Sequence, residues 1–276
     1  MRTFNIIGAG HVGRVLGRVF AASGCFAVQD VLTRQLASAQ QAVDFIGSGR
    51  AVAGIAELRR ADVTMLAVGD EQITPVCAAL AAAQQLAGSV VFHCSGALSS
   101  LDLQDAAQAG AFVASVHPIR SFADPEAVAG GFGGTFCGVE GDAGALAVLE
   151  HGLRACGARP VAIAAGAKTK TLYHAAAVFA SNYLVTVIDV ALRAYQAAGI
   201  PEPVARELAQ PLAMEALANA FRLGPAAALS GPIARGDMAT VARQQQGVAQ
   251  WDGAAGQLYQ ALVAPTFDLA RRKHQK

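Results

Sequence analysis

The chain has 276 residues, of which 54% are hydrophobic and 15% are charged, and its formal net charge is +1 at pH 7. At about 150 residues per domain, this length predicts two domains with ample apolar material for a large core. The only basic run is residues 271–273. The composition therefore excludes nucleic acid as the main partner, because neutralising phosphates takes many clustered cations.

Five cysteines are scattered along the chain without a C-x-x-C pair: Cys25, Cys77, Cys94, Cys137 and Cys156. This pattern predicts reduced thiols in a cytoplasmic protein rather than a disulfide framework, and we expect no metal site. The first predicted strand begins almost at Met1, so we also expect no signal peptide.

The first element is an apolar run of strand type, residues 4–7, followed by a G-x-G-x-x-G motif and a helical pattern. Gly8 lets the chain turn sharply off the strand, Gly10 leaves the backbone open to a pyrophosphate, and Gly13 lets the helix lie close to the sheet. The helix N-terminus also presents free N–H groups and a partial positive charge to phosphates. This context predicts a dinucleotide site rather than a nucleotide-free turn. The cofactor contacts predicted in this loop are Gly8, Gly10, His11, Val12 and Gly13.

The second strand, residues 26–32, ends in Thr33 and Arg34. An enzyme that prefers NAD would carry an Asp or Glu near this point to bind the ribose 2′-hydroxyl. Asp30 lies earlier, within the strand, where it is less well placed. Because an arginine can pair with a 2′-phosphate, Thr33 and Arg34 favour NADP over NAD as the cofactor. The alternative is that Arg34 only caps the following helix.

Strands and helices alternate as far as residue 163. Helical patterns cover 36–46 and 143–156, another helix begins at 70, and strands are predicted at 51–53, 63–68, 90–93, 111–116, 135–139 and 160–163. This alternation predicts an α/β fold with a doubly wound parallel sheet of the Rossmann type, which binds ligands at the carboxyl ends of its strands. The loops 8–13, 69–73, 93–97 and 117–122 should then line one crevice. In and beside these loops we expect cofactor contacts at Val68, Gly69, Ser95 and Gly96 and a substrate contact at His117.

Beyond residue 164 only helical patterns remain, at 168–198, 204–223, 240–246 and 251–272. We therefore expect an NAD(P)-binding Rossmann domain at 1–164 and an all-helical substrate and dimerisation domain at 165–276. Residues 171–188 contain no Asp, Glu, Lys or Arg and approach the length that spans a bilayer. They do contain polar side chains, so a buried central helix of a soluble protein is the better interpretation, with no membrane as partner.

The first of these helices carries Lys170, His174 and Asn182 on one face. Three aligned polar side chains, one of them a lysine, favour a set of catalytic residues. The alternative is a buried, hydrogen-bonded packing network. Tyr173 lies on a neighbouring strip, where we expect it to contact the substrate.

Residues 229–237, with the sequence LSGPIARGD, form a rigid polar loop between helices. One interpretation is a loop that closes over the cofactor or substrate, with Ser230 and Arg235 as substrate contacts and Arg235 available for a carboxylate or phosphate. The other is a structural turn with an internal pair between Arg235 and Asp237.

Six motifs carry a resemblance to a known family: GAGHVG, VGDEQI, HCSGAL, VHPIRSF, KTLYHAAAVFASNY and SGPIARGD. The sequence resembles bacterial Rossmann-like proteins with a C-terminal helical domain of unknown function. These are similar to pyrroline-5-carboxylate reductase, ketopantoate reductase and the 3-hydroxyisobutyrate and 6-phosphogluconate dehydrogenases. The resemblance implies an NADP-dependent oxidoreductase whose all-helical second domain commonly builds a dimer.

In the hydroxyacid dehydrogenases of this resemblance, a lysine and an asparagine one helical turn apart lie beside the reacting carbon. Lys170 matches that lysine, whereas His174 stands where the asparagine would be. A lysine near the nicotinamide could donate a proton to a carbonyl oxygen as hydride arrives, and His174 could do so at neutral pH with less tuning of its pKa.

The sequence thus predicts hydride transfer between NADP(H) and a small carbonyl or imine substrate held between the two domains of a homodimeric enzyme. The alternative is a non-catalytic NADP-binding sensor that acts through its helical domain. The polar face of Lys170, His174 and Asn182 favours the enzyme, because a sensor needs no proton donor beside the nicotinamide.

Overall fold

A computed structural model describes residues 1–273, and the chain divides into two compact units, Met1–Ser181 and a second that begins at Asn182. The predicted domain boundary, after residue 164, lies earlier than this division. Helix α7 (Ala167–Ala180) therefore belongs to the first unit, because its buried Lys170 is hydrogen-bonded to the sheet.

The first unit is built on one eight-stranded sheet with the order β3-β2-β1-β4-β5-β6-β7-β8. Strands β1 to β6 are parallel, as predicted, but β7 pairs antiparallel with β6, and β8 is parallel to β7. The expectation of a wholly parallel sheet is wrong at this edge. A strand that runs antiparallel to its neighbour can follow it without a crossover connection. Residues 119–135 make this connection from the end of β6 to the start of β7. The strands are β1 (Arg2–Ile7), β2 (Phe26–Leu32), β3 (Arg50–Val52), β4 (Val63–Leu66), β5 (Val90–His93), β6 (Phe112–Pro118), β7 (Phe136–Gly141) and β8 (Arg159–Ala162).

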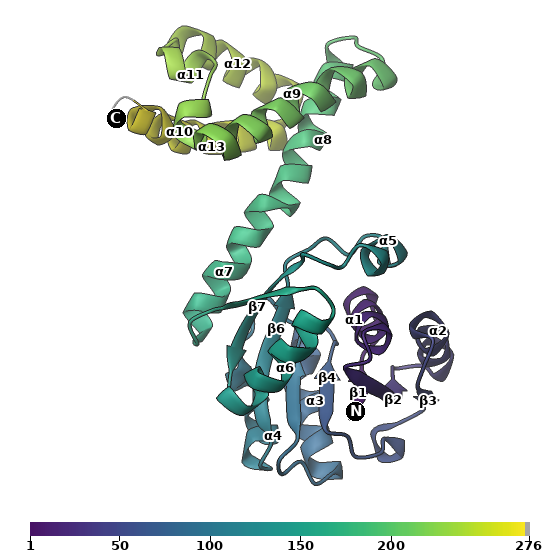
Figure 1. The fold of residues 1–276 in the computed structure, drawn as a ribbon. Helices are drawn as coiled ribbons and strands as arrows, with labels where there is room; N and C mark the ends of the chain where they lie inside the picture. Colours follow the sequence, from purple (N-terminus) through teal and green to yellow (C-terminus); the bar gives the residue numbers. More distant parts are fainter. Residues whose placement is uncertain (274–276) are drawn as a thin grey trace. The chain divides into compact units, whose positions relative to one another are not determined.

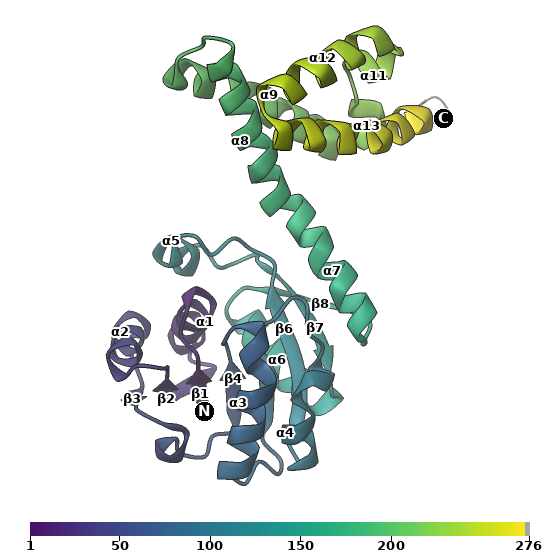
Figure 2. The ribbon, with the colours of Figure 1, turned by 180° about the vertical axis from the view of Figure 1, so that it is seen from behind.

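Helices cover both faces of this sheet (Figure 1), and Figure 2 shows the opposite face. One face carries α1 (His11–Ala22), α2 (Leu36–Ile46), α5 (Pro125–Gly130) and α6 (Ala143–Ala155). The other carries α3 (Asp70–Ala83), α4 (Gln104–Gln108) and the 3₁₀ turns η1 (Ile55–Glu57) and η2 (Ser100–Leu103). Phe4 and Ile6 of β1 belong to the first core and Ile7 to the second, as expected for central strands buried on both sides. The Phe4 ring contacts Phe20, Phe26 and Phe92.

The turn from β1 into α1 depends on two glycines. Gly8 has a φ of +86°, and a Cβ there would lie 2.6 Å from the carbonyl oxygen of Ala67. A Cβ at Gly13 would lie only 2.3 Å from the carbonyl oxygen of Gly8. Gly10 is different, because no atom lies within 4 Å of the position its Cβ would take. Gly8 and Gly13 therefore form the turn, while Gly10 leaves open space in front of it.

The described part of the second unit is all helical: α8 (Asn182–Ala197), α9 (Glu202–Leu223), α10 (Pro225–Ala228), α11 (Pro232–Arg235), α12 (Met238–Trp251) and α13 (Gly253–Lys273). Arg193 of α8 forms ion pairs with Asp189 on its own helix and with Asp252, which ends α12. The single helix predicted at 168–198 is interrupted at Ser181, whose φ of −131° and ψ of −75° are not helical. The proline-initiated turns α10 and α11 are too short to give a periodic pattern.

One helical segment among residues 1–273, Ala167–Ala197, is long and apolar enough to cross a membrane, with a mean hydropathy of 1.7. A single segment of this kind is weak evidence for a membrane span. None of the most apolar stretch of this segment is buried in the single chain. The prediction that residues 171–188 form a buried central helix is therefore wrong for a single chain. The reason is that only Lys170 of α7 reaches the interior, and no residue of α8 is buried.

We predict that Gly13→Ala lowers the free energy of unfolding by about 1–3 kcal/mol, because its methyl group would overlap the backbone of Gly8. The matched control is Gly10→Ala in the same loop, where the added methyl group meets no atom and stability should change by less than about 0.5 kcal/mol. Urea denaturation of both variants measures the difference. Equal stability of Gly13→Ala and the wild type would contradict the packing described for this turn.

Candidate functional site

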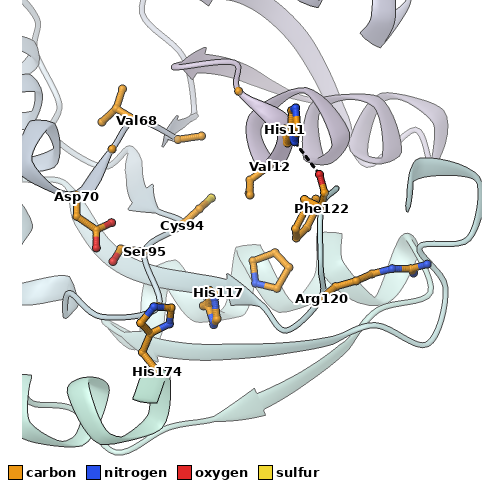
Figure 3. A pocket seen from close by; sticks show the side chains of 15 residues that line it. His11, Val12, Val68, Asp70, Cys94, Ser95, His117, Arg120, Phe122 and His174 are labelled. Atoms are coloured by element: carbon orange, nitrogen blue, oxygen red, sulfur yellow. Dashed lines mark hydrogen bonds between the residues drawn. The ribbon is translucent and has the colours of Figure 1, made fainter. Parts of the chain in front are cut away.

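A cavity of about 430 Å³ lies at the carboxyl ends of β1, β4, β5 and β6 (Figure 3). Residues from all four predicted crevice loops line it, so the predicted crevice is confirmed. The predicted contacts that line the cavity are Gly10, His11, Val12, Val68, Gly69, Ser95, Gly96, His117 and His174. The lining residues that were not predicted as individual contacts are Ala67, Asp70, Cys94, Pro118, Arg120 and Phe122. Most of these lie within the same loops, so loop position was the only signal for them.

The glycine loop and the N-terminus of α1 form one side of the cavity. Helix α1 begins at His11 after Gly10, and its first N–H groups have no partner earlier in the helix. The Nδ1 atom of His11 lies 2.7 Å from the carbonyl oxygen of Phe122, which joins the loop after β6 to the start of α1 (Figure 3). An open glycine at a helix N-terminus fits a diphosphate, because nothing fills the space before the N–H groups.

The end of β2 offers a cation and no free carboxylate. Asp30 is fully buried, and its carboxylate is paired with Arg50 at 3.0 Å and Arg59 at 2.7 Å. Burial alone would raise the pKa of Asp30, but the hydrogen bonds from Arg59 and Arg50 outweigh it and hold that pKa below its ordinary value. Thr33 donates its hydroxyl proton to the carbonyl oxygen of Gln35. Arg34 is exposed, and no described residue forms an ion pair with it.

Lys170 fixes α7 to the sheet from behind the cavity. Its side chain is fully buried, and Nζ donates to the carbonyl oxygen of Ser95 at 3.1 Å and to the hydroxyl of Ser115 at 2.8 Å. Burial lowers the pKa of Lys170, while the nearby carboxylates of Glu140 and Asp70 oppose that shift. Lys170 does not line the cavity. Its ammonium group instead holds the loop after β5, which does line the cavity, through the carbonyl of Ser95.

The loop after β5 is held by hydrogen bonds around Ser95. The backbone N–H of Ser95 donates to Nδ1 of His93. The proton of the His93 ring is therefore on Nε2, which donates to the carbonyl oxygen of Ser99. The hydroxyl oxygen of Ser95 accepts the N–H groups of Ala97 and Leu98. Burial lowers the pKa of His93, so its ring stays neutral at pH 7.

His117 of β6 and His174 of α7 lie next to each other in the cavity lining (Figure 3). Their ring centroids are 5.5 Å apart. A Cβ on Gly96 would lie 2.3 Å from Nδ1 of His174 and 2.8 Å from Nε2 of His117. Only glycine therefore leaves both rings in place. The Nδ1 atom of His174 is buried and has no hydrogen-bond partner among the described residues.

Tyr173 supports His117 from the other side. Its hydroxyl lies 3.0 Å from Nδ1 of His117, and the two rings meet edge to face. Burial raises the pKa of Tyr173 to about 12, so the hydroxyl keeps its proton at pH 7. Burial, followed by the charges of Lys170 and His174, lowers the pKa of His117 to about 4. At neutral pH the cavity therefore contains an uncharged His117 imidazole.

The other predicted site residues lie in the second unit. Asn182 is the first residue of α8. Ser230 lines a separate cavity of about 230 Å³ within that unit, together with Ile233, Gln244, Tyr259 and Leu262. Arg235 is the last residue of α11 and does not line that cavity. Arg235 and Asp237 form no ion pair within 4 Å, and the Asp237 carboxylate instead accepts the N–H of Thr240 at the start of α12. No group of three His, Cys, Asp or Glu side chains within residues 1–273 is arranged to hold a metal ion.

Residues 2–118 match the Rossmann-like domain, and residues 135–266 match a domain of unknown function, DUF2520. The second match begins just before β7, so it includes β7, α6, β8 and α7 of the first unit as well as most of the helical unit. No curated protein matches the sequence.

Solved structures share the fold over nearly the whole chain. Protein TM1727 from Thermotoga maritima is 25% identical, with a TM-score of 0.74, and the match covers 98% of this chain and 99% of that protein. The imine reductase from Myxococcus stipitatus, in complex with NADP+, is 16% identical with a TM-score of 0.65, over 99% and 94% of the two chains. Plasmodium falciparum pyrroline carboxylate reductase, with NADP bound, is 12% identical with a TM-score of 0.61, over 98% of each chain.

These matches agree with the two parts expected from the sequence motifs. The chain thus carries a match to the Rossmann-like domain followed by a match to the DUF2520 domain.

Proposed function

We propose that this protein is an NADP-dependent oxidoreductase that transfers a hydride between NADP(H) and a small carbonyl or imine compound. The observation that carries the proposal is that one cavity is lined both by the glycine loop and by the pair His117 and His174. A dinucleotide on the glycine loop would extend toward the two imidazoles. The names of the imine reductase and pyrroline carboxylate reductase, both solved with NADP, support the same class of reaction.

In this proposal the cofactor diphosphate binds at the N-terminus of α1, next to Gly10, and Arg34 binds the 2′-phosphate. Val68, Gly69, Ser95 and Gly96 continue the cofactor site along the strand ends. The cofactor supplies the hydride, and the protein positions it and excludes water. The paired state of Asp30 supports NADP over NAD, since that carboxylate is already occupied by two arginines.

The proton for the reduced oxygen or nitrogen comes, in this proposal, from His174, while the neutral His117 donates a hydrogen bond to the same atom. His174 lines the cavity, whereas Lys170 lies behind Ser95 and has both of its bonds inside the protein. We therefore assign Lys170 a positioning role, through the Ser95 carbonyl, rather than contact with the substrate. The hydroxyl of Tyr173 donates to Nδ1 of His117, which leaves the Nε2 proton of His117 directed toward Gly96 and the substrate. A neutral imidazole N–H can polarise a carbonyl without carrying a charge.

The experiment that tests this function is a panel of keto acids, aldehydes and cyclic imines incubated with NADPH, with loss of nicotinamide absorbance as the readout. Turnover of any member supports the oxidoreductase. Tight NADPH binding with no turnover across the panel would favour the alternative, an NADP-binding sensor.

We further propose that the chain forms a homodimer through its helices. Large apolar side chains on α7, α8 and α9 are exposed in the single chain: Leu172, Val185, Leu208, Leu212, Met214 and Phe221. Several large apolar side chains exposed on consecutive helices favour an interaction site, and a second copy of the chain is the occupant that requires no other partner.

For the cofactor, we predict that the wild type binds NADPH more tightly than NADH and that Arg34→Ala removes most of the difference. Loss of a charge-assisted contact to the 2′-phosphate costs about 1.5–3 kcal/mol, which corresponds to roughly a tenfold to hundredfold change in Kd. Fluorescence titration of both cofactors into both proteins measures this. NADH binding is the internal control, because Arg34→Ala should leave it unchanged. Equal affinities of the wild type for NADPH and NADH would disprove the assignment.

For catalysis, we predict that His174→Ala binds NADPH with unchanged Kd and loses 10²–10⁴-fold in turnover, as expected when a positioned proton donor is removed. The matched control is Thr171→Ala, on the same helix with an exposed side chain whose hydroxyl bonds only to the Ala167 carbonyl of that helix, which should keep wild-type turnover. Steady-state rates with the substrate found in the panel check both variants. Full activity of His174→Ala would remove His174 from the proposed mechanism.

For assembly, we predict that the wild type has the mass of a dimer at micromolar concentration and that Phe221→Glu shifts it toward the monomer. The Phe221 side chain is 90% exposed in the single chain, so a charge there would cost little except at an interface. Leu101→Glu is the control, since Leu101 is 71% exposed and belongs to η2, which is not one of the helices proposed to associate. Light scattering with size separation gives the masses, and a monomeric wild type would contradict the proposal.

A further inference from the structure

Two cysteines that are far apart in the sequence meet at one end of α1. Cys25 follows the end of that helix, and Cys156 ends α6. The hydroxyl of Ser23 lies between them, 3.0 Å from Sγ of Cys25 and 3.5 Å from Sγ of Cys156. Both thiols are partly exposed rather than enclosed.

The remaining contacts of these thiols are with backbone carbonyls. Sγ of Cys25 lies 3.6 Å from the carbonyl oxygen of Phe20, and Sγ of Cys156 lies 3.4 Å from that of Val19. The largest influences on the pKa of each thiol come from burial, hydrogen bonds and the other thiol of the pair, and for Cys156 also from Cys137, rather than from a charged side chain. The two sulfurs therefore interact with each other more than with any other titratable group.

The two thiols are chemically unequal. The hydrogen bond from Cys156, helped by the Ser23 hydroxyl, lowers the pKa of Cys25 to about 6 against the opposing effect of burial. The same contact, together with burial, raises the pKa of Cys156. Cys25 is thus the more readily deprotonated thiol of the pair and Cys156 the thiol hydrogen-bonded to it, an arrangement in which one sulfur attacks and the other resolves.

We propose that Cys25 and Cys156 form a thiol–disulfide exchange site that reacts with small disulfides of the glutathione disulfide class. The Cys25 thiolate attacks one sulfur of the small disulfide, which breaks its S–S bond and releases one small thiolate. Cys156 then loses its proton, attacks Sγ of Cys25 and expels the second small thiol, which takes up that proton. The protein dithiol is oxidised to a disulfide, and the small disulfide is reduced to two thiols.

The site is separate from the cavity that carries the proposed function, because it lies at the C-terminal ends of α1 and α6 and the cavity lies at the N-terminus of α1. The other cysteines provide internal standards. Burial raises the pKa of Cys77, Cys94 and Cys137, so their thiols should remain protonated and slow at neutral pH.

The first test is alkylation of the reduced wild-type protein by iodoacetamide at a series of pH values, followed by peptide mass mapping. We expect Cys25 to react at least tenfold faster than Cys77 and Cys137 at pH 7, with a half-maximal rate near pH 6. A Cys25 rate that does not exceed that of the buried cysteines would overturn the proposal.

The second test is incubation of the protein with oxidised glutathione and digestion without reductant. In the wild type we expect a cross-linked peptide containing Cys25 and Cys156, reversed by dithiothreitol. In Cys156→Ser we expect one glutathione retained on Cys25, because no resolving thiol is present. In Cys25→Ser we expect Cys156 to stay unmodified. Stable glutathione on wild-type Cys25, or no modification of it, would each overturn the exchange site.

Discussion

The candidate site depends on one buried hydrogen-bonded cation. The ammonium group of Lys170 binds the Ser95 carbonyl at the end of β5 and the Ser115 hydroxyl on β6, and so joins α7 to two neighbouring strands. A buried lysine is tolerated only where such partners replace water, so these bonds specify one position for the helix. This position of α7 also determines where Tyr173 and His174, one turn after Lys170, lie. Tyr173 contacts His117, and His174 lies next to Gly96. The imidazole pair is thus a consequence of where Lys170 is bound.

The shape of the cavity on the cofactor side depends on glycines, which have no side chain, rather than on a charged residue. Gly8 and Gly13 permit a backbone approach that no other residue could make, and Gly10 keeps the space before the helix open. Gly96 plays the same part on the opposite side, between the two imidazoles. Glycines at the ends of β1 and β5 therefore give the cavity its room, and the polar groups around it give it its chemistry.

The sequence predicted the alternating α/β order, the helical second part and the four loops that line the cavity, because apolar periodicity and glycine spacing are local signals. It did not predict the reversal at β7, since a short apolar strand has the same pattern in either direction. Helical spacing predicted Lys170, His174 and Asn182 on one face, and the first two do lie one turn apart on α7, but the helix is interrupted at Ser181, before Asn182. Helical spacing could not show that the lysine side chain ends behind Ser95 while the imidazole lines the cavity, because that depends on side-chain length and on packing between distant segments. The meeting of Cys25 and Cys156 has no sequence signal for the same reason.

In the proposed reaction, histidine in place of asparagine one turn after the lysine changes what the protein can supply. An asparagine amide orients a substrate but cannot release a proton, whereas an imidazole can do both. Burial of His117, followed by the nearby charges of Lys170 and His174, lowers the pKa of His117 to about 4, so His117 is uncharged at neutral pH. A hydride acceptor would then meet a neutral N–H donor whose orientation is held by Tyr173. Such a donor stabilises negative charge as it develops on oxygen or nitrogen and leaves no strong acid beside the reduced cofactor.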